Sequence, residues 1–159
     1  MRLCVATLFF ASTLTFPVQG LSQADAKIFS LSISAFQERV SSGRDMKLTV
    51  KLTNNSNHSI TLINRGLACD YIVEVRDSTG WSPEETEEKR KLKCSDAVAG
   101  KVIVINLKPG EHYEDLIFVN NLFDMTRPDK YTVLVAREIP RELGQGLVKS
   151  NPVNITVTE

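Results

Sequence analysis

The feature that most constrains the fold of this chain is the period of its apolar residues. From Ile28 onward, apolar residues recur at every second position far more often than at every third or fourth. A period of two is that of a strand with one buried face. The alternation is clearest within residues 30–36, at Leu31, Ile33 and Ala35, and within residues 47–53, at Leu48, Val50 and Leu52. We therefore expect a fold built from strands.

Turn residues interrupt this period at regular intervals. Clusters of Gly, Asn, Asp, Ser or Pro occur at residues 41–45, 54–58, 77–80, 108–111 and 144–146. Around them we expect further strands at residues 59–63, 71–76, 102–107, 113–119, 131–135 and 153–158. Seven or eight short strands without a strongly amphipathic helix predict an all-β antiparallel sandwich. Residues 102–107 are apolar on both faces, which indicates a central strand or a close contact with the preceding loop.

One segment has helical character but almost no apolar face. Residues 82–93 read SPEETEEKRKLK, with Ser82, Pro83 and Glu85 in the pattern of a helix-capping box. Two glutamates each precede a lysine by four residues, a spacing that stabilises helices: Glu85 with Lys89, and Glu87 with Lys91. Without an apolar face the segment cannot be a core helix. We predict a solvated, charged insertion at residues 82–94 with at most two helical turns.

The first twenty residues have the composition of an export signal. Arg2 precedes an uncharged, largely apolar run at residues 3–16, and Val18-Gln19-Gly20 matches a signal-peptidase site; a cut after Ala26 is the alternative. The run is shorter than the roughly 17 to 25 residues needed to span a bilayer. We predict a signal peptide at residues 1–20, a secreted or periplasmic location, no stable membrane span after cleavage, and one domain at residues 27–159.

Cleavage of that peptide leaves two cysteines, Cys69 and Cys94. An oxidising compartment favours a disulfide between them, which would add roughly 3 kcal/mol of stability by closing a loop of about 25 residues. Two buried free thiols are the alternative. A metal site is not expected, because neither cysteine belongs to a Cys-x-x-Cys pair and the two histidines, His58 and His112, are far apart in sequence.

The chain offers little that could perform catalysis. Both histidines lie at predicted turns, and the sequence has no Gly-x-Ser-x-Gly, His-Glu-x-x-His or Gly-rich phosphate motif. Removing Arg2 from 19 basic residues leaves 18 against 19 acidic ones, a formal net charge of −1 that does not attract nucleic acid. We predict no enzyme activity, no cofactor and no nucleic-acid partner. A calcium site remains an open alternative at four aspartates, although they lack the usual loop spacing: Asp70, Asp77, Asp124 and Asp129.

Two aromatic residues each have two interpretations. Trp81, the only tryptophan, stands beside the charged insertion. By default it packs against the sandwich; if exposed, it is a candidate contact with a partner. Tyr131 follows Pro128-Asp129-Lys130 and either locks a corner of the sandwich through its hydroxyl or is an ordinary buried aromatic residue.

Three stretches together resemble a known family. Residues 48–56 (LTVKLTNNS), 107–111 (LKPGE) and 129–133 (DKYTV) supply a strand, an Asn-Asn-Ser turn, a Pro-Gly-Glu turn and a Tyr-x-Val strand in that order. This order resembles the immunoglobulin-like β-sandwich domains of bacterial envelope proteins and, in part, the bacterial intracellular proteinase inhibitors. The resemblance covers about residues 46–136 and implies an immunoglobulin-like sandwich. We expect a binding module for a protein or an envelope polymer; the alternative is a proteinase inhibitor that uses the loop at residues 139–146.

Overall fold

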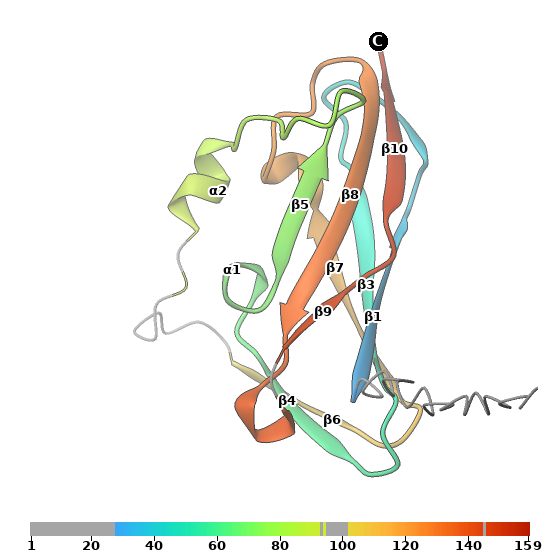
Figure 1. Cartoon of the computed structure of the whole chain (residues 1–159). Coiled ribbons are helices and arrows are strands. Elements are labelled where there is room, and N and C mark those ends of the chain that lie inside the picture. Colours follow the sequence, from blue (N-terminus) through green and yellow to red (C-terminus); the bar gives the residue numbers. More distant parts are fainter. Residues whose placement is uncertain (1–27, 93, 95–101, 145) are drawn as a thin grey trace, which may run out of the picture.

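Ten strands account for about half of the residues that the computed structural model describes, which are residues 28–92, 94, 102–144 and 146–159 (Figure 1). Apart from one parallel pair, neighbouring strands are antiparallel. The prediction of an all-β, antiparallel fold is therefore confirmed, with more strands than the seven or eight expected. The predicted signal peptide at residues 1–20 lies outside the described residues.

The first sheet has the order β1-β3-β7 and consists of β1 (Phe29–Ala35), β3 (Lys47–Asn54) and β7 (His112–Phe118). Strand β3 shows the full alternation predicted from the sequence, because Leu48, Val50 and Leu52 are buried while the residues between them are only partly covered. Val50 lies opposite Ile33 of β1 and Asp115 of β7. The inner face of this sheet is therefore apolar over β1 and β3 but carries a carboxylate on β7.

The second sheet has the order β2-β10-β8-β5, and β9 also pairs with β8. Its strands are β2 (Arg39–Ser41), β5 (Ile72–Arg76), β8 (Asp129–Glu138), β9 (Leu147–Lys149) and β10 (Val153–Thr158). The pair β2–β10 is parallel. The core lies between the two sheets and includes the fully buried Phe29, Ile117 and Ile155.

A two-stranded arm leaves the end of the sandwich, at the bottom of Figure 1, and consists of β4 (Ile60–Asn64) and β6 (Ile103–Leu107). At its base the buried Asn54 side chain donates from Nδ2 to the carbonyl oxygens of His58 and Leu107, at 2.8 and 2.9 Å. Among the described strands β6 pairs with β4 alone, and Ile103 and Val104 are exposed. The interpretation of residues 102–107 as a central strand is therefore wrong.

The helical segments are short: α1 (Leu67–Asp70), α2 (Glu87–Lys91) and the 3-10 turns η1 (Val119–Asn121) and η2 (Arg141–Leu143). Helix α2 is capped by Thr86, whose hydroxyl oxygen accepts a hydrogen bond from the Lys89 amide at 3.2 Å. The predicted capping box at Ser82 is wrong, because residues 82–86 are not helical and Glu85 forms a β-bridge with Phe123. Both predicted Glu–Lys pairs do form, at 2.8 and 2.9 Å.

Tyr131 lies at the start of β8 with its ring buried, and its hydroxyl donates to the carbonyl oxygen of Arg127 at 2.9 Å. This is the backbone contact predicted for a tyrosine that locks a corner. Replacing Tyr131 with phenylalanine is expected to lower the free energy of unfolding by about 1 kcal/mol, since the change removes one hydrogen bond and keeps the ring. Urea denaturation measures the difference, and an unchanged midpoint would show that the bond contributes nothing.

Candidate functional site

Trp81 lies at the end of a tight turn that follows β5, and its side chain is 75% exposed. The expectation that it packs against the sandwich is therefore wrong. The turn, residues 77–81, is closed by Asp77: its amide donates to the Trp81 carbonyl oxygen at 2.8 Å, and its carboxylate accepts from the Trp81 amide at 2.9 Å. Gly80 takes a φ of 87°, which suits glycine and few other residues. We call these five residues the Trp81 turn.

The carboxylate of Asp77 is held in its charged form. A hydrogen bond from the Thr79 hydroxyl, at 2.6 Å, together with the amides of Trp81 and Thr79 lowers the pKa of Asp77 below its ordinary value. A lowered folded-state pKa means that the carboxylate favours the folded turn at neutral pH and that this contribution is lost as the pH falls through that pKa. The Trp81 turn therefore presents its indole on a fixed backbone at neutral pH.

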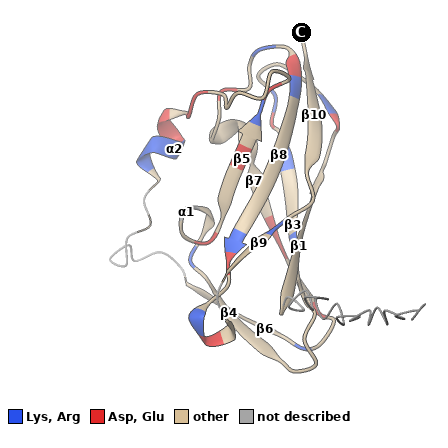
Figure 2. Cartoon of the chain, in the orientation of Figure 1, with Lys and Arg blue, Asp and Glu red and all other residues tan. Residues whose placement is uncertain are grey.

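The charged insertion is anchored to the sandwich. The Thr86 amide donates to the Leu122 carbonyl oxygen at 3.0 Å, and the Asp124 amide donates to the Glu84 carbonyl oxygen at 2.8 Å. The Lys89 ammonium lies 3.7 Å from the centroid of the Phe123 ring, a cation–π contact. Figure 2 shows both signs of charge on α2, so the insertion presents no field of a single sign.

Cys69 and Cys94 form a disulfide, as predicted, with their Cα atoms 4.7 Å apart. Cys69 belongs to α1 and Cys94 follows α2. The bond therefore ties the charged insertion to the short helix that precedes β5.

A groove of about 890 Å³ lies between the arm and the end of the second sheet. Strand β4, α1, the start of β5 and the segment from Arg137 through η2 all contribute to its walls. We call it the arm groove. Its apolar residues include Ile63 and Ile72, both exposed, and Ile139, which is half-buried. Its volume falls in the range of small-ligand sites, about 300 to 1,000 Å³.

The polar part of the arm groove contains a buried arginine and a buried aspartate, Arg137 of β8 and Asp70 of α1, whose side chains are each only 4% exposed. Arg137 Nη2 lies 4.0 Å from the Asp70 carboxylate and donates to the Ile63 carbonyl oxygen at 2.8 Å. Arg65 also contacts Asp70, through its backbone amide and through two guanidinium nitrogens at 3.3 Å. Two guanidinium groups thus share one carboxylate.

Two donors beside this cluster have no hydrogen-bond partner among the described residues, namely Arg137 Nη1 and the Tyr71 hydroxyl, and both are buried. The Arg137 guanidinium lies 5.0 Å from the centroid of the Tyr71 ring. Burial raises the pKa of the Tyr71 hydroxyl, an effect opposed by the charge of Arg137, so the phenol stays protonated at neutral pH. An unpartnered buried donor costs about 1 to 3 kcal/mol, so both groups have hydrogen-bonding capacity that an acceptor would satisfy.

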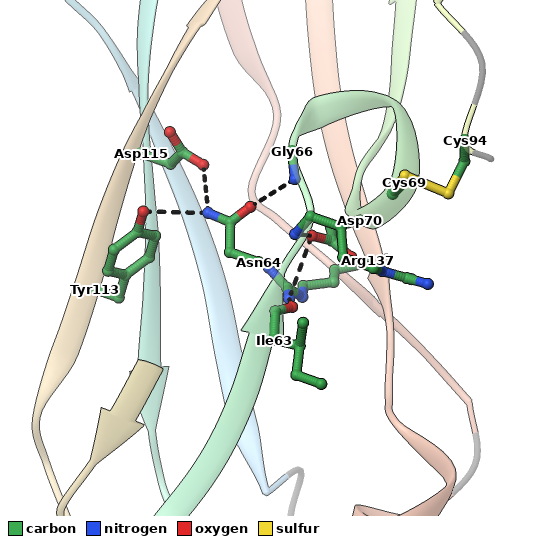
Figure 3. A network of polar contacts seen from close by, with 10 residues as sticks. Ile63, Asn64, Gly66, Cys69, Asp70, Cys94, Tyr113, Asp115 and Arg137 are labelled. Atoms are coloured by element: carbon green, nitrogen blue, oxygen red, sulfur yellow. Dashed lines mark hydrogen bonds and ion pairs between the residues drawn. A yellow bond between two sulfur atoms is a disulfide. The ribbon is translucent and has the colours of Figure 1, made fainter. Parts of the chain in front are cut away.

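A second polar group lies next to this cluster (Figure 3). Asn64, the last residue of β4, donates from Nδ2 to the Tyr113 hydroxyl and to the Asp115 carboxylate, both at 3.1 Å, and accepts from the Gly66 amide at 2.9 Å. Gly66 has a φ of 101°, which lets the chain turn from β4 into α1. These bonds fix α1, and with it Asp70, against the arm.

The histidines considered for catalysis lie at the surface, whereas Asp77 and Asp129, two of the aspartates considered for calcium, are close enough to interact. His58 and His112 are both exposed, and their rings contact Asn57 and Glu114, their near neighbours in sequence. Within the described part of the chain, no three His, Cys, Asp or Glu side chains are placed to hold a metal ion. None of the described helices is long and apolar enough to cross a membrane.

Comparisons with known proteins identify no family for this chain. No protein-family model matches it, and no curated protein matches it either. Among solved structures, it is similar to a β-glucosidase from Erythrobacter marinus with 12% sequence identity and a TM-score of 0.42, over 82% of this chain. The chain spans 15% of the length of that glucosidase. A similarity at this level assigns neither a fold family nor an activity.

Sequence reasoning singled out Cys69, Asp70 and the loop at residues 139–146, each for a different role, but did not predict that they line one groove. The signal that could have revealed it is in β8. Tyr131, Val133 and Val135 point to the core with a period of two, and Arg137 occupies the next position in the same phase. A charged residue at a core position of a strand indicates a buried ionic site.

Proposed function

We propose that this chain is an exported, non-catalytic binding module with an immunoglobulin-like sandwich, and that it contacts a protein partner through the Trp81 turn. The hydrogen bond from Tyr131 to Arg127 supports the immunoglobulin-like assignment, because such sandwiches use a tyrosine in this way. The disulfide is consistent with an oxidising compartment.

The exposure of Trp81 carries the proposal. Large aromatic residues are normally buried, at least in part, and tryptophan is enriched among residues that dominate binding energy. Here the indole is 75% exposed on a turn whose backbone is fixed by Asp77. Since the turn is already ordered, a partner loses little binding energy to ordering it.

Replacing Trp81 with alanine tests the proposal. We expect the variant to lose affinity for the native partner by at least tenfold, while its free energy of unfolding changes by less than about 0.5 kcal/mol, as for other exposed side chains. The partner is captured from the native source on the immobilised wild-type chain, and affinities are then measured by calorimetry.

Phe36 supplies the matched control, because it is an equally exposed aromatic residue, at 73%, elsewhere on the surface. Replacing Phe36 with alanine should leave partner affinity unchanged. Equal binding by the wild-type chain and the Trp81 variant would show that the Trp81 turn is not the contact, and turnover of a substrate by the purified chain would contradict the non-catalytic assignment.

Proteinase inhibition stays a prediction, and no observation in the described residues favours it. The loop proposed for it contains the 3-10 turn η2 and is closed by the Ile139 amide, which donates to the Gly146 carbonyl oxygen at 3.0 Å. Ile139 and Leu143 pack against the core. Titration against subtilisin-like and trypsin-like proteases decides the question.

A further inference from the structure

Around Asp70 the arm groove has two guanidinium groups on one carboxylate and two donors without acceptors, while the rest of its charged lining consists of Arg141, Glu138 and Glu142. At its polar end, the guanidinium groups of Arg65 and Arg137 share the single carboxylate of Asp70. Arg137 Nη1 and the Tyr71 hydroxyl have no acceptor among the described residues. An anionic acceptor would satisfy both features, and a carboxylate matches the planar geometry of a guanidinium group.

The walls of the arm groove beside this cluster are apolar. Ile63 of β4 and Ile72 of β5 are exposed there, with the half-buried Ile139 between the end of β8 and η2. An apolar side chain placed among them would remove this surface from water, which is favourable. The ligand therefore has an apolar group close to its carboxylate.

Strand β4 also has a free edge that faces the arm groove. Among the described residues β4 pairs with β6 on one side only, and the Ile63 carbonyl oxygen turns away from β6 to accept from Arg137, as the dashed line in Figure 3 shows. In an antiparallel pair, alternate residues turn their backbone groups outward, so Thr61 also presents its amide and carbonyl to the groove, where its side chain lies at the wall. A ligand with an extended main chain can pair with this edge.

We propose that the arm groove binds the carboxyl terminus of an extended peptide whose last side chain is apolar. The main chain adds to the free edge of β4, the last side chain packs between Ile63 and Ile72, and the terminal carboxylate accepts hydrogen bonds from Arg137 Nη1 and the Tyr71 hydroxyl. Because both donors are buried, a side chain has to move to admit the carboxylate. This site is separate from the Trp81 turn, which lies at the other end of β5.

Peptide titrations on the disulfide-bonded chain test each part of the proposal. The probe is N-acetyl-Ala-Ala-Ala-Leu with a free carboxylate, compared with its C-terminal amide, with a copy N-methylated on alternate residues, and with N-acetyl-leucine. We expect the free acid to bind at least tenfold more tightly than each of the other three. Amide resonances of Thr61, Ile63 and Ile72 should shift on binding, and those of the Trp81 turn should not.

Exposed substitutions test the location of the site without disturbing the core. Ile72→Asp places a carboxylate in the arm groove and should weaken binding of the free acid at least tenfold. The matched control is Leu116→Asp, an exposed position on β7 outside the groove, which should bind as the wild-type chain does. Circular dichroism confirms that both variants are folded.

Three results would overturn the proposal. If no peptide binds at millimolar concentration, or the amide binds as tightly as the acid, the groove does not recognise a terminal carboxylate. If N-acetyl-leucine binds as tightly as the peptide, the site takes a small organic acid and β4 adds no strand. If Ile72→Asp and Leu116→Asp behave alike, the peptide binds elsewhere.

Discussion

Replacing Arg137 with methionine is expected to lower the free energy of unfolding by about 3 to 5 kcal/mol, the usual cost of removing one partner from a buried ion pair. Arg137 and Asp70 are almost completely buried, and Arg137 also donates to the Ile63 carbonyl oxygen at 2.8 Å. The variant leaves that carbonyl without its donor, and it leaves the Asp70 carboxylate compensated by Arg65 alone. Chemical denaturation measures the loss.

A matched control and a double variant distinguish the effect of breaking the Arg137–Asp70 ion pair from the effect of losing any arginine. Arg127 is exposed, so Arg127→Met should change stability by less than about 0.5 kcal/mol. Combining Arg137→Met with Asp70→Asn should cost less than the sum of the two single changes, because neither charge is then left alone. A loss below about 1 kcal/mol for Arg137→Met, or full additivity in the double variant, would show that the two side chains are not coupled.

Reducing the Cys69–Cys94 disulfide is expected to lower the free energy of unfolding by about 3 kcal/mol, because the bond closes a loop of 25 residues in the unfolded chain. Replacing both cysteines with serine should give the same loss. The variant should then be insensitive to reductant, which serves as the control. Urea midpoints measured with and without dithiothreitol give the difference.

The same experiment has a local readout. The residues from Glu84 to Lys89 keep contacts with η1 and Phe123 that do not depend on the disulfide. Residues 90–92, in contrast, are exposed and lie between those contacts and Cys94, so the disulfide ties this end of the insertion to α1. Hydrogen exchange should therefore increase first at residues 90–92, before the sandwich opens. Equal midpoints with and without reductant, or two free thiols at Cys69 and Cys94 by mass spectrometry of the chain isolated from its native source, would contradict this prediction.

The strands with a clear period of two could be predicted from the sequence. Strands β1, β3 and β10 lie within about one residue of the expected segments, because one face of each is buried in the core. Strands β2 and β9 have three residues each, too few to show a period. Whether an apolar segment is central or at an edge depends on which strands pair, and a local pattern does not determine pairing, so the sequence could not decide between the two interpretations of residues 102–107.

The candidate site likewise contains one part that could be predicted from the sequence and one part that could not. The disulfide could be predicted because removal of the predicted signal peptide would leave two cysteines and one way to pair them. The arm groove depends on residues from β4, α1, β5 and β8, which are far apart in sequence. Polar residues at core positions of strands were nevertheless visible: Asn54, Asn64, Asp115 and Arg137 all continue the phase of buried apolar neighbours.

The parallel pairing of β2 with β10 has a mechanical consequence. Strand β1 begins at the end of the sandwich that holds the arm, and β10 finishes at the opposite end (Figure 1). Tension between these two points pulls both strands along their own axes. The backbone hydrogen bonds of these strands lie across the direction of pulling. The bonds are therefore loaded in shear, and they share the load. Because β8 holds one edge of β10 and β2 the other, the final strand resists extraction along both of its edges.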